Sequence, residues 1–203
     1  AQLHPDDSLS LLSSVKSADL LERKPLGMPT CWMDRARCAC NGGVSPQPKI
    51  VQEAQISEKD TVFELGCGRG RTCFWLNSFV GCKVVGIEYI PEFVERAKII
   101  KKKLGVEGVE FRLDDMLTAD YTGATVIYLY GTCLKDEFIE QLVKKFNTLP
   151  AGTKIITVSY PLVDYTSSSS FEVMKRFPAV FTWGEADVYL QIVQNKNSGV
   201  INP

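Results

Sequence analysis

Apolar and polar positions follow a regular pattern from Asp60 onward. Short, nearly continuous apolar runs alternate with stretches in which apolar residues recur every three or four positions. The short runs indicate strands buried on both faces of a parallel sheet, and the spaced stretches indicate helices that cover it. This alternation predicts a doubly wound α/β architecture. The predicted strands are Thr61–Leu65, Lys83–Glu88, Val109–Leu113, Ala124–Tyr130 and Thr153–Tyr160, and the predicted helices are Arg71–Val80, Pro91–Leu104 and Lys135–Asn147.

The last part of the chain has a different pattern. A small polar stretch, Thr166–Ser170, is followed by two further apolar segments, Ala179–Trp183 and Val188–Val193. Only Gly184, Glu185 and Ala186, with Asp187, separate these segments, which is typical of a hairpin. We therefore expect an antiparallel pair of strands at the edge of the sheet.

The N-terminal region does not share the alternating pattern. Leucines and a valine between Leu9 and Leu21 can line one face of a short helix, and an irregular stretch ending at Pro46 and Pro48 follows. An isolated helix of that length is marginal in water, so we expect it to lie over a larger domain. The predicted organisation is an arm or cap over residues 1–48 and a single domain over residues 49–203.

Composition and charge agree with a globular domain. The 203 residues are 45% hydrophobic, and 23 basic residues against 24 acidic ones give a net charge of −1 and a pI of about 6.0. A basic excess is the usual mark of proteins that bind a nucleic-acid backbone, so no DNA partner is expected. A local basic patch at Lys101–Lys103 is left open.

No stretch of about 18 apolar residues suggests a membrane span, and no signal peptide is evident, although a lost leader before Ala1 is left open. The odd number of cysteines, seven, suits reduced thiols and a cytoplasmic location. No metal site is expected, because Cys31, Cys38 and Cys40 have no partner pair and the only histidine is His4. A Ser-His-Asp or Cys-His nucleophile within the core is excluded for the same reason.

A glycine-rich turn between the first predicted strand and helix is the most informative motif. Gly66, Gly68 and Gly70 come directly after a buried strand that carries Glu64. Glycines permit a positive φ and let a ligand approach the backbone closely. The G-x-G-x-G spacing differs from the dinucleotide pattern G-x-G-x-x-G, and no Walker lysine follows. Because Glu64 would repel a pyrophosphate and attract a cation, the loop favours a ligand with an ammonium or sulfonium end.

Two more acidic positions end the next strands. Glu88 ends the second strand, 22 positions after Gly66, and can accept both hydroxyls of a ribose. Asp114 and Asp115 follow the third strand, and one of them can accept a hydrogen bond from an exocyclic amino group such as that of adenine. Together the strand-end acids describe an adenosine that carries an amino-acid tail.

These residues resemble the motifs of class I S-adenosylmethionine-dependent methyltransferases, over roughly Pro46 to Gln194. The resemblance implies a Rossmann-like, mostly parallel seven-stranded sheet whose last two strands form the predicted hairpin. It also implies S-adenosylmethionine as cofactor: Glu64 and the glycine loop hold its methionine end, Glu88 its ribose, and Asp115 its adenine. The full set of implied cofactor contacts is Glu64, Gly66, Cys67, Gly68, Gly70, Glu88, Tyr89, Asp115, Met116 and Tyr130.

The methyl acceptor is indicated only weakly. The fourth strand ends without the Asp/Asn-Pro-Pro-aromatic motif of enzymes that methylate amino groups of DNA bases or glutamine. The overall sequence also resembles the seven-strand lysine methyltransferases, including histone enzymes of the disruptor-of-telomeric-silencing type. Tyr130 and Thr132 are therefore the predicted catalytic, acceptor-positioning residues. Tyr160 and Trp32 are candidates for an aromatic wall around an amine, or for core packing.

The leading hypothesis is thus transfer of a methyl group to a protein lysine or another amine. Three alternatives stay open: a small-molecule methyltransferase, an NAD-binding oxidoreductase, and a degenerate fold that binds a partner and no cofactor. Neither the acceptor, the number of methyl groups transferred nor the oligomeric state follows from the sequence.

Overall fold

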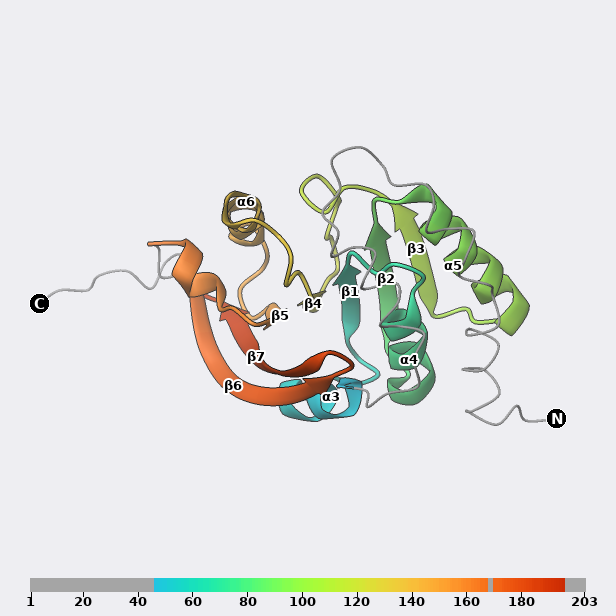
Figure 1. Ribbon diagram of the computed structural model, residues 1–203, viewed down its shortest axis with the longest axis horizontal. Coiled ribbons are helices and arrows are strands. Elements are labelled where there is room, and N and C mark those ends of the chain that lie inside the picture. The colour runs from blue at the N-terminus through green and yellow to red at the C-terminus, as the bar shows by residue number, and fades with distance from the viewer. Residues whose placement is uncertain (1–45, 168–169, 196–203) are drawn as a thin grey trace, which may run out of the picture.

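A computed structural model describes residues 46–167 and 170–195 of the chain. Its sheet has seven strands in the order β3-β2-β1-β4-β5-β7-β6, which confirms the predicted doubly wound α/β architecture (Figure 1). The strands are β1 (Thr61–Leu65), β2 (Lys83–Glu88), β3 (Val109–Leu113), β4 (Val126–Leu129), β5 (Lys154–Val158), β6 (Phe171–Phe181) and β7 (Gly184–Val193). The helices are α3 (Gln47–Ala54), α4 (Arg71–Val80), α5 (Pro91–Leu104), α6 (Asp136–Phe146) and a 3₁₀ helix, η2 (Leu162–Tyr165).

Five strands are parallel, and the last two are not. β3, β2, β1, β4 and β5 run in one direction, whereas β7 is antiparallel to both β5 and β6. The carboxyl ends of the five parallel strands therefore lie at one edge of the sheet, which we call the carboxyl edge. Loops at this edge are where open α/β sheets bind their ligands.

The core consists of two layers separated by the sheet. One layer packs α3, α4 and α5 against one sheet face, and the other packs α6, η2 and the β3–β4 connection against the opposite face. Figure 1 shows α6 and α3 on opposite sides of the central strands. Strands such as β1 and β4 are buried on both faces, which explains their continuous apolar sequences.

Local signals account for the helix boundaries. α5 begins with Pro91, whose fixed φ suits the first turn, and carries Glu92 there; Lys101–Lys103 occupy its last turn. Gly105 ends the helix with a φ of 63°, the left-handed conformation that glycine adopts most easily. The predicted bounds of this helix and of Arg71–Val80 agree with the structure.

Two strands are shorter than the sequence predicts. β4 begins at Val126 instead of Ala124, because the Ala124 amide closes a turn with the Tyr121 carbonyl. β5 ends at Val158 instead of Tyr160, because Ser159 has a φ of 76° that breaks the extended backbone. Both differences come from turns whose geometry the apolar pattern does not show.

The C-terminal hairpin is present, but its predicted turn is wrong. Gly184–Ala186, which we expected to form the turn, are the first residues of β7 and pair with Ala179–Phe181 of β6. The turn is instead at Thr182 and Trp183, and β6 begins at Phe171, eight residues before the predicted start. The first half of β6 is mostly exposed and carries charged side chains, so its sequence lacks a buried-strand pattern. Such an edge strand also tolerates Pro178.

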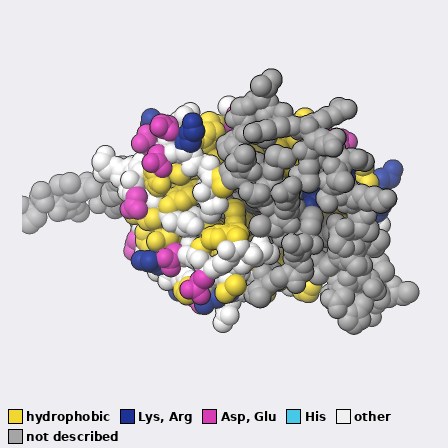
Figure 2. Space-filling view, viewed as in Figure 1, with side chains coloured by type: hydrophobic (Ala, Val, Ile, Leu, Met, Phe, Trp, Pro, Cys, Tyr) yellow, Lys and Arg dark blue, Asp and Glu magenta, His cyan; other side chains and the backbone are white. Residues whose placement is uncertain are grey.

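α3 packs in the same core layer as α4 and α5, and the predicted boundary at residue 48 falls within the first turn of this helix. The helix expected between Leu9 and Leu21 lies outside the described residues, as do His4, Cys31, Cys38 and Cys40. None of the helices within residues 46–167 and 170–195 is long and apolar enough to cross a membrane. Figure 2 shows acidic and basic side chains interspersed around apolar ones on the described part of one face.

A polar network at the amino ends of β1 and β4 gives a first testable prediction. The Asp60 carboxylate accepts hydrogen bonds from the Ser57 amide (2.8 Å) and the Thr125 hydroxyl (2.8 Å), and the same hydroxyl accepts one from the Thr61 amide. Burial acts to raise the pKa of Asp60, but these bonds and the Lys154 charge outweigh it, so the pKa lies below its usual value. The charged carboxylate therefore stabilises the fold.

We expect Asp60→Asn to lower the free energy of unfolding by about 1 kcal/mol at neutral pH, because the charged acceptor is lost. Since the folded-state pKa is below the unfolded one, the wild-type advantage should disappear as the pH falls through the folded pKa. Urea unfolding of both proteins over the acid range measures this. Glu140→Gln is the control, because Glu140 is an exposed carboxylate on α6, far from this network in the sequence. The prediction would be contradicted if both variants lost the same free energy of unfolding. It would also be contradicted if the difference in stability between wild type and Asp60→Asn did not change with pH.

Candidate active site

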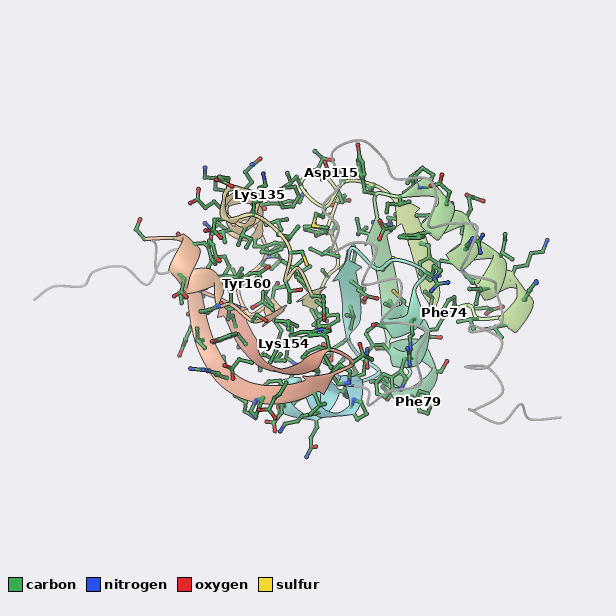
Figure 3. The ribbon with its side chains drawn as sticks, in the orientation of Figure 1. Phe74, Phe79, Asp115, Lys135, Lys154 and Tyr160 are labelled. Atoms are coloured by element: carbon green, nitrogen blue, oxygen red, sulfur yellow. The ribbon has the colours of Figure 1, made fainter. Side chains whose placement is uncertain are left out.

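Strand register brings the predicted site residues to one place. Leu65, the last residue of β1, is in register with Ile87 of β2 and with Leu129, the last residue of β4. Glu88 of β2 is in register with Leu113, the last residue of β3. The glycine loop, the strand-end acids and Tyr130 therefore all lie at the carboxyl edge. In Figure 3, Asp115 lies beyond this edge, whereas Phe79 lies near the opposite end of the sheet.

The glycine loop has a backbone conformation that residues other than glycine rarely adopt. Gly66, Gly68 and Gly70 have φ angles of 70°, 58° and 78°. The amides of Gly66 and Cys67 both donate to the Ile87 carbonyl of β2, at 2.8 and 3.0 Å. The loop is thus tied to the neighbouring strand before it enters α4.

A second glycine position explains how the loop is seated. A Cβ atom on Gly86, in β2, would lie 2.6 Å from the Cys67 sulfur, 2.9 Å from the Phe111 ring and 3.0 Å from the Cys73 sulfur. Real Cβ atoms do not approach so closely, so only glycine lets the loop and α4 pack onto the strand here. The loop position therefore depends on a residue outside the loop motif.

Glu64 lies under the loop, not at its open surface. Its side chain is 1% exposed, and its carboxylate accepts a hydrogen bond of 3.0 Å from the Cys73 thiol of α4. Burial, the neighbouring Cys67 and the Glu64 charge together raise the pKa of the Cys73 thiol well above its usual value. The thiol therefore keeps its proton at neutral pH and serves as the donor.

The Glu88 side chain is held by hydrogen bonds from three backbone amides. Its carboxylate is 1% exposed and accepts from the Gly68 amide at 2.7 Å, the Tyr89 amide at 2.9 Å and the Ile90 amide at 3.0 Å. The bond to Gly68 joins the end of β2 to the glycine loop. Three backbone amides therefore fix the orientation of this carboxylate.

The site has space and a fixed hydrogen-bond acceptor for an adenosine with an amino-acid tail. A Cβ atom on Gly68 would meet no atom of residues 46–167 or 170–195 within 4 Å, so this part of the chain leaves the space above the middle of the loop open. The fixed carboxylate of Glu88 borders this loop through its bond to Gly68. Within the described ranges, no group of three or more His, Cys, Asp or Glu side chains is placed to hold a metal ion. An open backbone beside a fixed carboxylate fits a nucleoside, whose hydroxyls donate hydrogen bonds.

The predicted adenine-side residues lie in the turn that follows β3. The Asp114 amide donates to the Glu88 carbonyl at 3.1 Å, which links the two strand ends. Asp115 accepts from the Leu117 amide at 2.8 Å through one carboxylate oxygen. Met116 is buried, and its carbonyl accepts from the Tyr121 hydroxyl. Tyr89 is 63% exposed, so its ring stands at the surface beside this turn.

Tyr130 and Thr132, the predicted acceptor-side residues, follow β4. Tyr130 packs edge-on against Phe181 with ring centres 5.5 Å apart, and its hydroxyl accepts from the indole nitrogen of Trp183. Thr132 is partly buried, and its hydroxyl lies 3.7 Å from the Cys133 sulfur. The roles assigned to all these residues stay predictions.

Tyr160 packs against the opposite face of the sheet from Tyr130, near the carboxyl ends of β4 and β5. Its ring packs against Tyr165 with centres 5.5 Å apart, and its hydroxyl lies close under Gly131. Burial raises the pKa of this hydroxyl. Among the described residues, it is one of two buried side-chain polar atoms without a hydrogen-bond partner. Trp32, the other candidate for an aromatic wall, lies outside the described residues.

Three residues of the site are missing from the sequence-based prediction. Cys73 binds Glu64 across nine positions, and Phe181 and Trp183 reach Tyr130 from more than 50 positions away. The only local signal for the last two is that aromatic residues flank Thr182, and the apolar pattern there predicts a strand.

Comparisons with known proteins agree with this geometry. Residues 64–169, just over half of the chain, match the family described as the ANTKMT methyltransferase domain. Protein-L-isoaspartate O-methyltransferase 2 of Archaeoglobus fulgidus is 33% identical over 105 residues, which cover 51% of this chain and 47% of that protein. A protein-lysine N-methyltransferase of Saccharolobus islandicus is 26% identical over 116 residues, covering 56% of this chain and 71% of that protein.

Solved structures show the same fold. An RNA methyltransferase from Salinibacter ruber, solved in complex with S-adenosyl-L-homocysteine, has a TM-score of 0.62 and 25% sequence identity. The match covers 79% of this chain and 100% of that one. The chain spans less than half the length of several curated relatives that it matches. On the family match, the chain belongs to the ANTKMT methyltransferase domain family, which confirms its place among the class I S-adenosylmethionine-dependent methyltransferases.

Proposed function

We propose that the protein transfers a methyl group from S-adenosylmethionine to the side-chain amine of a protein lysine. The observation that carries this proposal is the position of Tyr130, directly after β4 and beside the glycine loop that follows the in-register end of β1. A cofactor held by that loop would present its reactive carbon on the side where Tyr130 and its aromatic neighbours stand.

The chain's own residues would hold the cofactor in an extended pose. The glycine loop and the buried Glu64 beneath it would receive the methionine end, Glu88 the ribose hydroxyls, and Asp115 with Met116 the adenine. When bound, S-adenosylmethionine supplies the methyl group: the acceptor nitrogen bonds to the methyl carbon while the carbon–sulfur bond breaks and its electron pair stays on sulfur. The protein contributes alignment of the two groups and exclusion of water.

The acceptor nitrogen must be neutral when it attacks the methyl carbon, because only its lone pair can form the new bond. Aromatic surroundings such as Tyr130 and Phe181 disfavour a charged ammonium by desolvation and so lower the pKa of an entering lysine. The proton that the nitrogen releases after methylation then passes to water at the exposed mouth of the site.

Two of the similar proteins support lysine as the acceptor. One is the protein-lysine N-methyltransferase of Saccharolobus islandicus, and the other is a histone-lysine N-methyltransferase of Dictyostelium discoideum, 29% identical over 120 residues. The absence of an Asp/Asn-Pro-Pro-aromatic motif after β4 also favours lysine over DNA bases.

A labelling experiment tests the proposal. The purified protein is incubated with a cell lysate and S-adenosylmethionine carrying a labelled methyl group, and the protein fraction is hydrolysed and analysed for methylated amino acids. We expect the label in Nε-methylated lysine. Label confined to small molecules, RNA or other amino acids would overturn the proposal, and Glu88→Ala serves as the inactive control.

A further inference from the structure

The tip of the β6–β7 hairpin extends beyond the carboxyl edge of the sheet. Val158, the last residue of β5, pairs with Val188 of β7, and the Ser159 amide donates to the Asp187 carbonyl at 2.8 Å. The residues of β7 before Asp187, and their partners in β6, therefore project past the end of β5. This is the edge at which the glycine loop lies.

Three aromatic side chains join this tip to the end of β4. Phe181 is buried, packs edge-on against Tyr130 at 5.5 Å, and stacks against Trp183 with ring centres 5.4 Å apart and planes 14° apart. The indole nitrogen of Trp183 donates to the Tyr130 hydroxyl. Trp183 is nevertheless 47% exposed.

This arrangement fixes the orientation of the indole ring. One face of Trp183 is covered by Phe181 and its polar edge is engaged with Tyr130, so its exposed area is on the remaining side. A tryptophan face attracts cations more strongly than other aromatic rings. The hydrogen bond from the indole to the Tyr130 hydroxyl is directional, so it restrains the tyrosine ring more than edge-on packing against Phe181 does.

We infer that the hairpin tip forms one wall of the methyl-acceptor site and that Trp183 is the positioning residue for Tyr130. This wall fits an alkylammonium side chain as the methyl acceptor. The side chain would pass the exposed indole face of Trp183 before losing its proton. The identity of this acceptor rests on the proposed function. The wall itself rests only on the contacts among Tyr130, Phe181 and Trp183.

A set of matched variants separates this role from simple packing. Trp183→Phe keeps an aromatic ring on Phe181 and removes the indole donor, whereas Tyr130→Phe removes the acceptor oxygen. We expect each variant to lower methyl transfer to lysate protein about tenfold, because one hydrogen bond is lost. The double variant should be no worse than either single one, since both remove the same bond. Cofactor affinity, measured by calorimetry, should stay unchanged in Trp183→Phe, because Trp183 is not among the implied cofactor contacts.

Trp75→Phe is the matched control, because Trp75 stacks within α4 on Phe79, which lies near the opposite end of the sheet. It should transfer methyl groups at the wild-type rate. Trp183→His, which restores an N–H donor on a smaller ring, should recover part of the lost rate. A wild-type rate for Trp183→Phe, or additive losses in the double variant, would overturn the inference.

A second measurement does not depend on methyl transfer. The chain has three tryptophans, so an NMR spectrum of the ¹⁵N-labelled protein shows three indole N–H signals, and Trp183→Phe identifies one of them. With S-adenosylhomocysteine present, n-butylammonium should shift the Trp183 signal, and neutral n-butanol should not. An unchanged signal would overturn the inference. A shift without any methyllysine in lysate would instead overturn only the choice of protein lysine as acceptor.

Discussion

Replacing Glu88 with alanine is expected to weaken S-adenosylmethionine binding by about 2–3 kcal/mol, which is roughly a hundredfold rise in Kd. The carboxylate is buried at the end of β2 and fixed by the amides of Gly68, Tyr89 and Ile90. Its loss removes the charged acceptor for the ribose hydroxyls. It also frees the Gly68 amide, so the glycine loop loses one of its attachments. Isothermal calorimetry with the purified variant measures the change in Kd.

Two comparisons show whether the effect comes from the site. Glu110→Ala removes a carboxylate from the neighbouring strand β3, where Glu110 pairs at the surface with Arg112 at 2.7 Å, and should leave the Kd unchanged. Glu88→Gln keeps a carbonyl oxygen for the backbone amides and loses the charge, so it should fold better than Glu88→Ala and still bind weakly. A folded Glu88→Ala protein with wild-type affinity would disprove the ribose assignment.

Gly68→Ala is expected to weaken cofactor binding by about 1–3 kcal/mol, because the added methyl group would occupy space that the ligand needs. Gly68 has a φ of 58°, and its added Cβ would meet no protein atom within 4 Å. The folded protein therefore suffers only the strain of an alanine in the left-handed region, about 1 kcal/mol. Cofactor affinity should therefore fall while the variant stays folded.

Gly123→Ala is a closely matched control for that experiment. Gly123 has a φ of 83°, and its added Cβ would also meet nothing within 4 Å, but it lies in the turn before β4, at the other end of the sheet. The two variants should lose similar stability in urea unfolding, and only Gly68→Ala should lose cofactor affinity. Equal affinities in the two variants would mean that the ligand does not approach the backbone at Gly68.

The cofactor side of the site could be predicted because its signals are local. A strand followed by alternate glycines, and acids that end successive strands, are patterns within a few adjacent residues, and parallel strands bring their carboxyl ends together by necessity. The structure adds what those patterns do not contain. Glu64 is buried against Cys73, and the loop rests on Gly86, a residue of another strand.

The acceptor side could not be predicted in the same way. The turn at Thr182 and Trp183 was assigned to a strand, since Gly184 is a stronger local turn signal than either residue. The exposed start of β6 carries Glu172, Lys175 and Arg176 and no buried run, so apolar periodicity does not detect it. Both errors concern an edge strand, where one side faces solvent and the sequence is least constrained by packing.

The sequence by itself determined the succession of β1 to β5 with α4, α5 and α6 along the chain, the glycine loop and the acids at the strand ends. Only the tertiary structure decided which residues face the loop from elsewhere in the chain. Trp183 meets Tyr130 across 53 positions, and this contact depends on the place of β7 beside β5 and on the length of the hairpin beyond the sheet. Turn and periodicity signals act between near neighbours, whereas strand order and register are decided by the packing of the whole sheet.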